Sequence, residues 1–110
     1  MELTIEVKAK KTSFQELYQT LLALVPVIRK KKGLQKISIN RDPKDDDVFL
    51  VFFEWEDQES LVHYLRSNDG SALLGAIEVL SEKTKVKIGD NEPMVGILPL
   101  QKMREGTYRH

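Results

Sequence analysis

Apolar and polar residues alternate over residues 2–9, and this period of two predicts a strand with one buried face. From Phe14 the apolar residues recur at helical intervals, and Ser13 stands three residues before Glu16, the spacing of a capping box. The pattern therefore predicts a helix from Phe14 to Lys32. It should stop at Gly33, because glycine readily adopts the left-handed conformation that closes helices.

The remaining pattern predicts three more strands and a second helical layer. Strands are expected over residues 34–40, 48–55 and 84–88, with a polar turn, RDPKDDD, between the first two. Asp57 is a suitable N-cap for a helix that should break at residues 67–71 and resume as far as Leu80. The order strand, helix, strand, strand, helix, strand predicts an α+β fold, the ferredoxin-like βαββαβ plait with an antiparallel sheet.

The third predicted strand, VFLVFFEW, is apolar on both faces. One face carries Val48, Leu50 and Phe52, and the other carries Phe49, Val51 and Phe53. The helices of a plait cover one face only, and each large apolar side chain left in water forgoes roughly 1.5–3 kcal/mol of a total stability of about 5–15 kcal/mol. A homodimer packed sheet to sheet is therefore predicted. A C-terminal segment folded over the bare face is the alternative.

Length and composition indicate one globular domain. The 110 residues are expected to form a plait over residues 1–90 and a tail over residues 91–110, for which packing on the partner subunit is one prediction. Lys plus Arg and Asp plus Glu both number 17, a balance that disfavours nucleic acid and anionic membrane as partners. The first residues lack the apolar core of a signal peptide, and no run approaches ~18 apolar residues. A cytoplasmic location is expected by default.

Several kinds of chemistry lack their usual residues. The chain has no cysteine, which excludes a disulfide, a thiolate nucleophile and a cysteine-based metal site. The aspartates of residues 42–47 lack the spacing and glycine of an EF-hand, so a solvated turn is favoured over a calcium site. No glycine-rich phosphate loop or nucleophile elbow is present. Neither a metal nor a cofactor is predicted.

One stretch of the sequence is similar to a known family. Residues 28–67, IRKKKGLQKISINRDPKDDDVFLVFFEWEDQESLVHYLRS, resemble the centre of antibiotic biosynthesis monooxygenase (ABM) domains. In these domains a helix ends at a charged turn with glycine, here Gly33, and the strand after an Asp/Pro loop closes on residues matching Glu54 and Trp55. The resemblance implies a dimeric α+β barrel with a pocket between the helices and the sheet of each subunit.

The resemblance also implies an activity. Relatives oxidise quinols or anthrone-type polyketides with dioxygen and without a metal or flavin, so the expected function is cofactor-independent oxygenation of a flat aromatic or quinol-type molecule. Quinol-oxidising members often have histidine at the position of Tyr64, and haem-degrading members place a histidine where this chain has SALLGAIEVL, which contains none. Haem degradation is therefore disfavoured. A non-catalytic small-molecule-binding or structural homodimer is the alternative.

Five residues are candidates for the site, and each has a plain structural interpretation. Trp55 could stack on a flat ligand or fill the core, and Tyr18 could face it from the first helix. Tyr64, with His63 as a base, could deprotonate a phenol, although neighbouring helical positions do not share a face and His63 could be a surface residue. Asn40 could donate to a ligand carbonyl or begin the turn.

Overall fold

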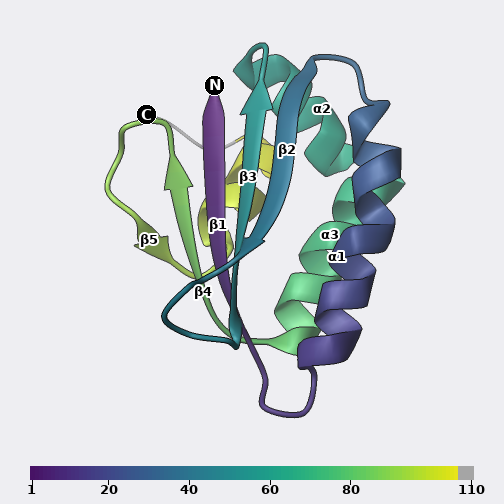
Figure 1. Cartoon of the computed structure of the whole chain (residues 1–110). Helices are drawn as coiled ribbons and strands as arrows, with labels where there is room; N and C mark the ends of the chain where they lie inside the picture. The colour runs from purple at the N-terminus through teal and green to yellow at the C-terminus, as the bar shows by residue number, and fades with distance from the viewer. Residues whose placement is uncertain (107–110) are drawn as a thin grey trace.

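The computed structural model describes residues 1–106 and shows one antiparallel sheet with helices on one side (Figure 1). Its strand order is β2-β3-β1-β4-β5, so the first and third strands are central, as the plait requires. The elements, in chain order, are β1 (Glu2–Ala9), α1 (Phe14–Arg29), β2 (Leu34–Arg41), β3 (Val48–Trp55), α2 (Gln58–Arg66), α3 (Asn68–Leu80), β4 (Ser81–Ile88), β5 (Met94–Val95) and α4 (Leu98–Glu105). The predicted fold class is confirmed.

The register of the sheet gives it two chemically different faces. On the helix face, Leu3 of β1 lies between Phe53 of β3 and Ile88 of β4, and all three are buried. The opposite face, here called the open face, carries no helix among the described residues (Figure 1). One row across all five strands of this face consists of Asn40, Leu50, Glu6, Lys85 and Val95. Apolar positions of β3 therefore lie among charged neighbours on a face that the described chain leaves uncovered.

The first helix is shorter than predicted. It ends at Arg29, with Lys30 as its C-cap, rather than at Lys32. The predicted capping box is wrong, because the Ser13 side chain makes no capping hydrogen bond. Gly33 has a φ of 87°, the left-handed region expected for it, but it lies beyond the helix, in the turn before β2. A Cβ added there would collide with Ser60 at the start of α2, so this turn packs directly on the second helical layer.

The predicted break in the second helical layer is confirmed. The Asp57 side chain accepts a hydrogen bond from the Ser60 N–H at 2.8 Å and so caps α2. Ser67 ends α2 and begins α3, because its hydroxyl accepts from the Gly70 N–H at 3.1 Å. A Cβ on Gly70 would collide with the Tyr64 carbonyl oxygen, so only glycine lets α3 pass so close to α2. Gly70 is therefore required for the close packing of α3 on α2 beside Tyr64.

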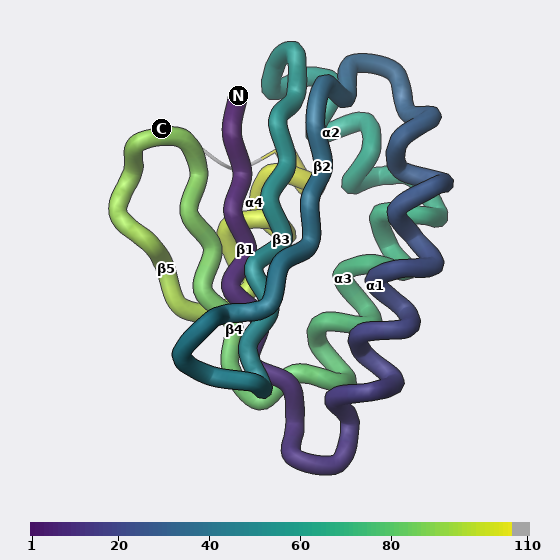
Figure 2. Tube along the Cα trace, viewed as in Figure 1, coloured from purple at the N-terminus to yellow at the C-terminus, as the bar shows by residue number. Residues whose placement is uncertain are grey.

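The C-terminal segment packs on its own chain as far as the structure describes it. Strand β5 pairs with the edge of β4, and α4 lies beside α2, with Leu100 and Met103 in the same core as β1 (Figure 2). The alternative of a tail folded over the open face is therefore wrong for residues 94–106. Contact of this segment with a partner stays a prediction. Within residues 1–106, no helix has the length and apolar content needed to cross a bilayer.

Candidate functional site

The interior between β3 and α2 brings two of the predicted site residues together. Trp55 is the last residue of β3 and Tyr64 lies on the inner side of α2, and their ring centroids are 5.3 Å apart with 28° between the planes. Phe53 adds a third ring 6.4 Å from Tyr64. Trp55 is 0% exposed and Tyr64 2% exposed. An apolar strand end and an amphipathic helix thus form a closed aromatic cluster.

This cluster contains two polar atoms without partners. The Trp55 indole Nε1 and the Tyr64 hydroxyl oxygen are buried, and neither makes a hydrogen bond. Buried polar side-chain atoms are rarely left in this state, because each costs about 1–3 kcal/mol. The indole N–H can only donate, and a protonated tyrosine hydroxyl can donate as well. Both atoms are therefore available to a hydrogen-bond acceptor that enters the cluster.

Electrostatics make Tyr64 a donor rather than a base. Burial raises the pKa of its hydroxyl well above the ordinary value of 10, and the nearby negative charge of Asp69 adds to the rise. Asp69 itself is paired with Lys31, which follows the C-cap of α1, at 2.6 Å. At neutral pH the Tyr64 hydroxyl therefore keeps its proton and can offer it in a hydrogen bond.

The other predicted site residue on α2 faces away from this cluster. His63 is exposed and lines a surface hollow of about 820 Å³ together with Lys32, Glu59 and Arg66. Successive helical positions differ by roughly 100°, which directs His63 outward while Tyr64 points inward. The structure does not bring the His63 imidazole to the Tyr64 hydroxyl. Deprotonation of a buried substrate by this pair has no support in the geometry.

Two further predicted ligand contacts lie elsewhere in the fold. Tyr18 stacks on Phe49 at the start of β3, with centroids 5.2 Å apart and planes 1° apart. Phe49 and Trp55 stand six residues apart on an extended strand, which separates them by roughly 20 Å. Asn40 is exposed, lies on the open face and donates from Nδ2 to the Ser38 hydroxyl at 3.4 Å. Of the five predicted site residues, the structure thus brings only Trp55 and Tyr64 together, at the end of β3 and on the inner side of α2.

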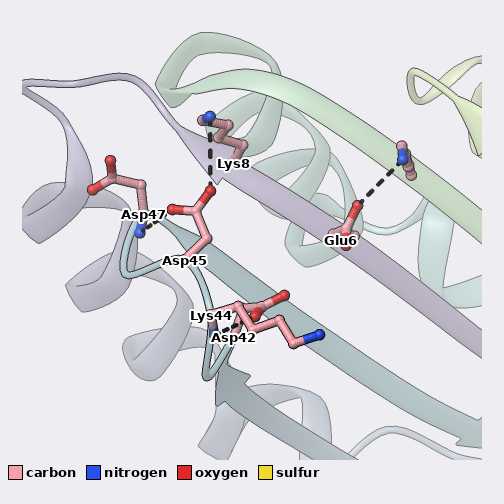
Figure 3. Close-up of polar contacts among 7 residues, drawn as sticks. Glu6, Lys8, Asp42, Lys44, Asp45 and Asp47 are labelled. Carbon is pink, nitrogen blue, oxygen red and sulfur yellow. Dashed lines mark hydrogen bonds and ion pairs between the residues drawn. The ribbon is translucent and has the colours of Figure 1, made fainter.

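The aspartate-rich turn between β2 and β3 uses its carboxylates locally (Figure 3). Asp42 accepts from the Lys44 N–H at 2.8 Å, and Asp45 accepts from the Asp47 N–H at 3.0 Å while facing the Lys8 ammonium at 3.8 Å. In residues 1–106 no group of three or more His, Cys, Asp or Glu side chains is arranged to hold a metal ion. These contacts account for the turn as a folded hairpin loop.

The fold defines a class of protein: a ferredoxin-like α+β domain, here with an aromatic cluster between sheet and helices. The sequence model of the family described as antibiotic biosynthesis monooxygenase matches residues 1–73, which include β1, Trp55 and Tyr64. The chain belongs to the antibiotic biosynthesis monooxygenase family. Among curated proteins, none matches the chain significantly.

Solved structures support the same fold. A conserved Methanosarcina mazei protein superposes with a TM-score of 0.76 at 17% identity, over 83% of this chain and 91% of its own. A protein described as antibiotic biosynthesis monooxygenase gives a TM-score of 0.74 at 18% identity, over 84% and 98%. A Pseudomonas aeruginosa protein gives 0.72 at 19% identity, over 86% and 91%. At these identities the likeness concerns the fold.

Proposed function

We propose that this chain is a cofactor-independent monooxygenase of the ABM family that acts on a flat, neutral aromatic molecule bearing a carbonyl or quinol oxygen. The observation that carries the proposal is the pair of unpartnered donors, Trp55 Nε1–H and Tyr64 Oη–H, in an otherwise apolar interior. Apolar pockets with a few convergent polar groups are the usual form of small-molecule sites. The oxygen of the ligand would accept both hydrogen bonds.

Two donors that bond to the same substrate oxygen could promote oxidation without a base in the site. If a substrate ketone such as an anthrone accepts both bonds, they stabilise the enolate that forms when its CH₂ group loses a proton to water admitted with the substrate. The electron-rich enolate then reacts with dioxygen. One oxygen atom ends in the new carbonyl and the other in water, so that CH₂ plus O₂ gives C=O plus H₂O. Tyr64 serves this step as a proton donor in a hydrogen bond, in line with its raised pKa.

We also propose that the chain forms a homodimer, and the open face supports this. Leu50 and Phe52 lie on β3, between the edge strand β2 and the central strand β1, and are only half-buried, with the Lys36 ammonium 5.8 Å from the Phe52 ring centroid. Around them are charges of both signs, including Glu6 and Lys85, whose side chains face one another at 4.0 Å. Apolar side chains surrounded by polar and charged ones are common in protein interfaces. A second copy would cover Leu50 and Phe52 by pairing the sheets face to face.

Oxygen consumption tests the catalytic proposal directly. The protein is incubated in air with an anthrone or with reduced menadione, and dioxygen uptake is followed against the rate without protein. We expect uptake that falls in Trp55→Phe and Tyr64→Phe, since each lacks one donor but keeps an aromatic ring. Tyr18→Phe is the matched control and should retain the wild-type rate. Uptake equal to the protein-free rate, or equal in all three variants, would refute the proposal.

A non-catalytic binding protein is the second candidate, favoured by one observation. His63 faces away from the cluster and Tyr64 is held protonated, so neither of the predicted catalytic residues acts as a base at the buried site. This candidate predicts binding of the same aromatic compounds, seen as a change in Trp55 fluorescence, with no dioxygen uptake above the protein-free rate. The two assays together separate an oxygenase from a carrier.

A further inference from the structure

One side of α1 is apolar and faces solvent. Leu22 and Val27 are 45% and 39% exposed, two of the five large apolar residues that are exposed in residues 1–106. Ala23 and Pro26, which lie between them in the sequence, are exposed as well. The opposite side of the same helix is buried against α3 and β2. Because the helices cover one face of the sheet only, the exposed side of α1 points away from the open face (Figure 1).

The two ends of this side carry opposite charges. Glu16 lies in the first turn of α1, and Lys30 is its C-cap. Both are exposed, and neither forms an ion pair within residues 1–106. Each stands seven positions from Ala23, one before it and one after it, which is about two helical turns. Glu16, Ala23 and Lys30 therefore lie along one line on the exposed side.

This arrangement is self-complementary for two antiparallel copies of α1. A two-fold axis beside Ala23 brings the two alanines together and sets Glu16 of each copy level with Lys30 of the other. The small alanine side chain lets the helix axes approach to about 8 Å, the short end of the usual range. Gln19 and Val27 both stand four positions from Ala23 and so meet across the same axis. A parallel pair would instead set like charges against each other, so the charges select the antiparallel one.

We propose that the exposed side of α1 is a second contact between copies of this chain, in which two α1 helices pack antiparallel about a two-fold axis at Ala23, with Glu16 of each copy against Lys30 of the other. The contact does not depend on the proposed function, because it uses neither the aromatic cluster nor the open face. It covers the apolar side of α1 and pairs both charges twice.

The size of the contact sets its strength. With 16 residues, α1 is about 24 Å long and about 10 Å wide. Two such helices share a footprint far smaller than the ~800 Å² that each partner buries in a stable interface. The association is therefore expected to be weak, with a Kd of about 0.1–1 mM.

Sedimentation equilibrium of the full chain, from about 10 μM to about 1 mM, tests the contact. The average mass should rise reversibly with concentration above its value at the lowest concentration. Ala23→Arg sets two arginines against each other on the two-fold axis and should remove this step. It should leave the mass at the lowest concentration unchanged, because that mass reports on the separate open-face contact.

Exchanging the charges tests the antiparallel geometry. Glu16→Lys sets lysine against Lys30 at both ends of the contact, and should weaken the association constant roughly 2- to 30-fold, for two surface ion pairs of about 0.2–1 kcal/mol each. Glu16→Lys combined with Lys30→Glu restores opposite charges and should restore the constant of the wild type. Glu59→Lys makes the same change in the first turn of α2 and is the matched control, which should associate like the wild type.

Three results would overturn the contact. They are a mass that stays constant over the whole range, an Ala23→Arg protein that associates like the wild type, and a double exchange that fails to restore what Glu16→Lys removes. Because Glu16, Ala23 and Lys30 are exposed, all these variants should keep the Trp55 emission and the Tm of a folded chain. An oxygen assay without uptake would reject the proposed function and leave this contact standing.

Discussion

Replacing Tyr64 by phenylalanine should make the free protein more stable. The substitution removes the buried hydroxyl that has no partner and leaves a ring against Trp55 and Phe53. An unpartnered buried hydroxyl costs about 1–3 kcal/mol. The gap left by one oxygen atom, roughly 10–15 Å³, takes back only about 0.3 kcal/mol at about 24 cal/mol per Å³. The net gain expected in the free energy of unfolding is about 1–2.5 kcal/mol.

Thermal and urea unfolding measure this gain. For a domain of this size, each kcal/mol should raise Tm by about 4 °C, so Tyr64→Phe should melt roughly 4–10 °C higher than the wild type. Tyr18→Phe is the control, because Tyr18 is half-buried and its hydroxyl is not among the unpartnered buried atoms. It should change stability by less than about 0.5 kcal/mol. A Tyr64→Phe protein less stable than the wild type would show that the hydroxyl has a partner in solution and would refute the reasoning.

Ligand binding should change in the opposite direction. Tyr64→Phe loses one hydrogen bond to the bound acceptor, about 0.5–1.5 kcal/mol, so the affinity for an anthrone should fall roughly 2- to 13-fold. A variant that gains stability and loses affinity identifies the hydroxyl as a ligand contact. A gain in stability with unchanged affinity would instead mark Tyr64 as a core residue and exclude it from the site.

The Tyr64 hydroxyl should also change how the free energy of unfolding depends on pH in alkaline solution. The pKa of Tyr64 is raised in the folded state above its unfolded value near 10, so the folded chain keeps a proton that the unfolded chain releases. Below pH 10 the hydroxyl is protonated in both states and this titration does not alter stability. As pH rises from 10 toward the folded pKa, proton release from the unfolded chain lowers the free energy of unfolding of the wild type. The difference in stability between wild type and Tyr64→Phe should therefore widen above pH 10, by up to about 1.4 kcal/mol per pH unit. Parallel pH profiles of the two proteins would contradict the assignment.

Two further predictions concern the open face and the turn before β2. Phe52→Lys should abolish the proposed homodimer and leave a folded monomer, seen by light scattering at micromolar concentration. Val79→Lys on α3, at a side chain 63% exposed, should leave the mass unchanged. A wild-type protein that is already monomeric would contradict the dimer. Gly33→Ala combines a left-handed backbone with a collision with Ser60 and should cost about 2–4 kcal/mol in urea unfolding. Gly89→Ala, with a φ of 56° and no neighbour within 4 Å, should cost only about 1–2 kcal/mol, and equal losses would rule out the collision.

Most of the fold could be predicted because its signals are local. Alternation marks β1, and the polar run at residues 67–71 marks the break between α2 and α3. The start of β4 was predicted at Thr84 and lies at Ser81, because α3 passes into β4 without a loop. For the segment that forms β5 and α4, the sequence pattern predicts no helix or strand. Its apolar residues, PMVGILPL, follow neither period long enough to indicate an element.

The site was predicted only in part, for a geometric reason. Trp55 and Tyr64 meet because α2 folds back directly over the end of β3. Tyr18 lies near the start of α1, which follows the end of β1, and β3 runs antiparallel to β1. Tyr18 must therefore lie beside Phe49, at the far end of β3 from Trp55. Nothing in the sequence indicates that the charge of Asp69 influences Tyr64, since their proximity depends on the close approach of α2 and α3 that Gly70 permits.

The composition of the chain makes its interior unusually easy to observe. Trp55 is the sole tryptophan and the chain has no cysteine, so emission from the indole reports on one buried position without interference. A single thiol introduced at Lys102 on α4 could carry an acceptor dye for energy transfer from that indole. Energy transfer would then measure the distance between the end of β3 in the sheet and the last helix of the same chain.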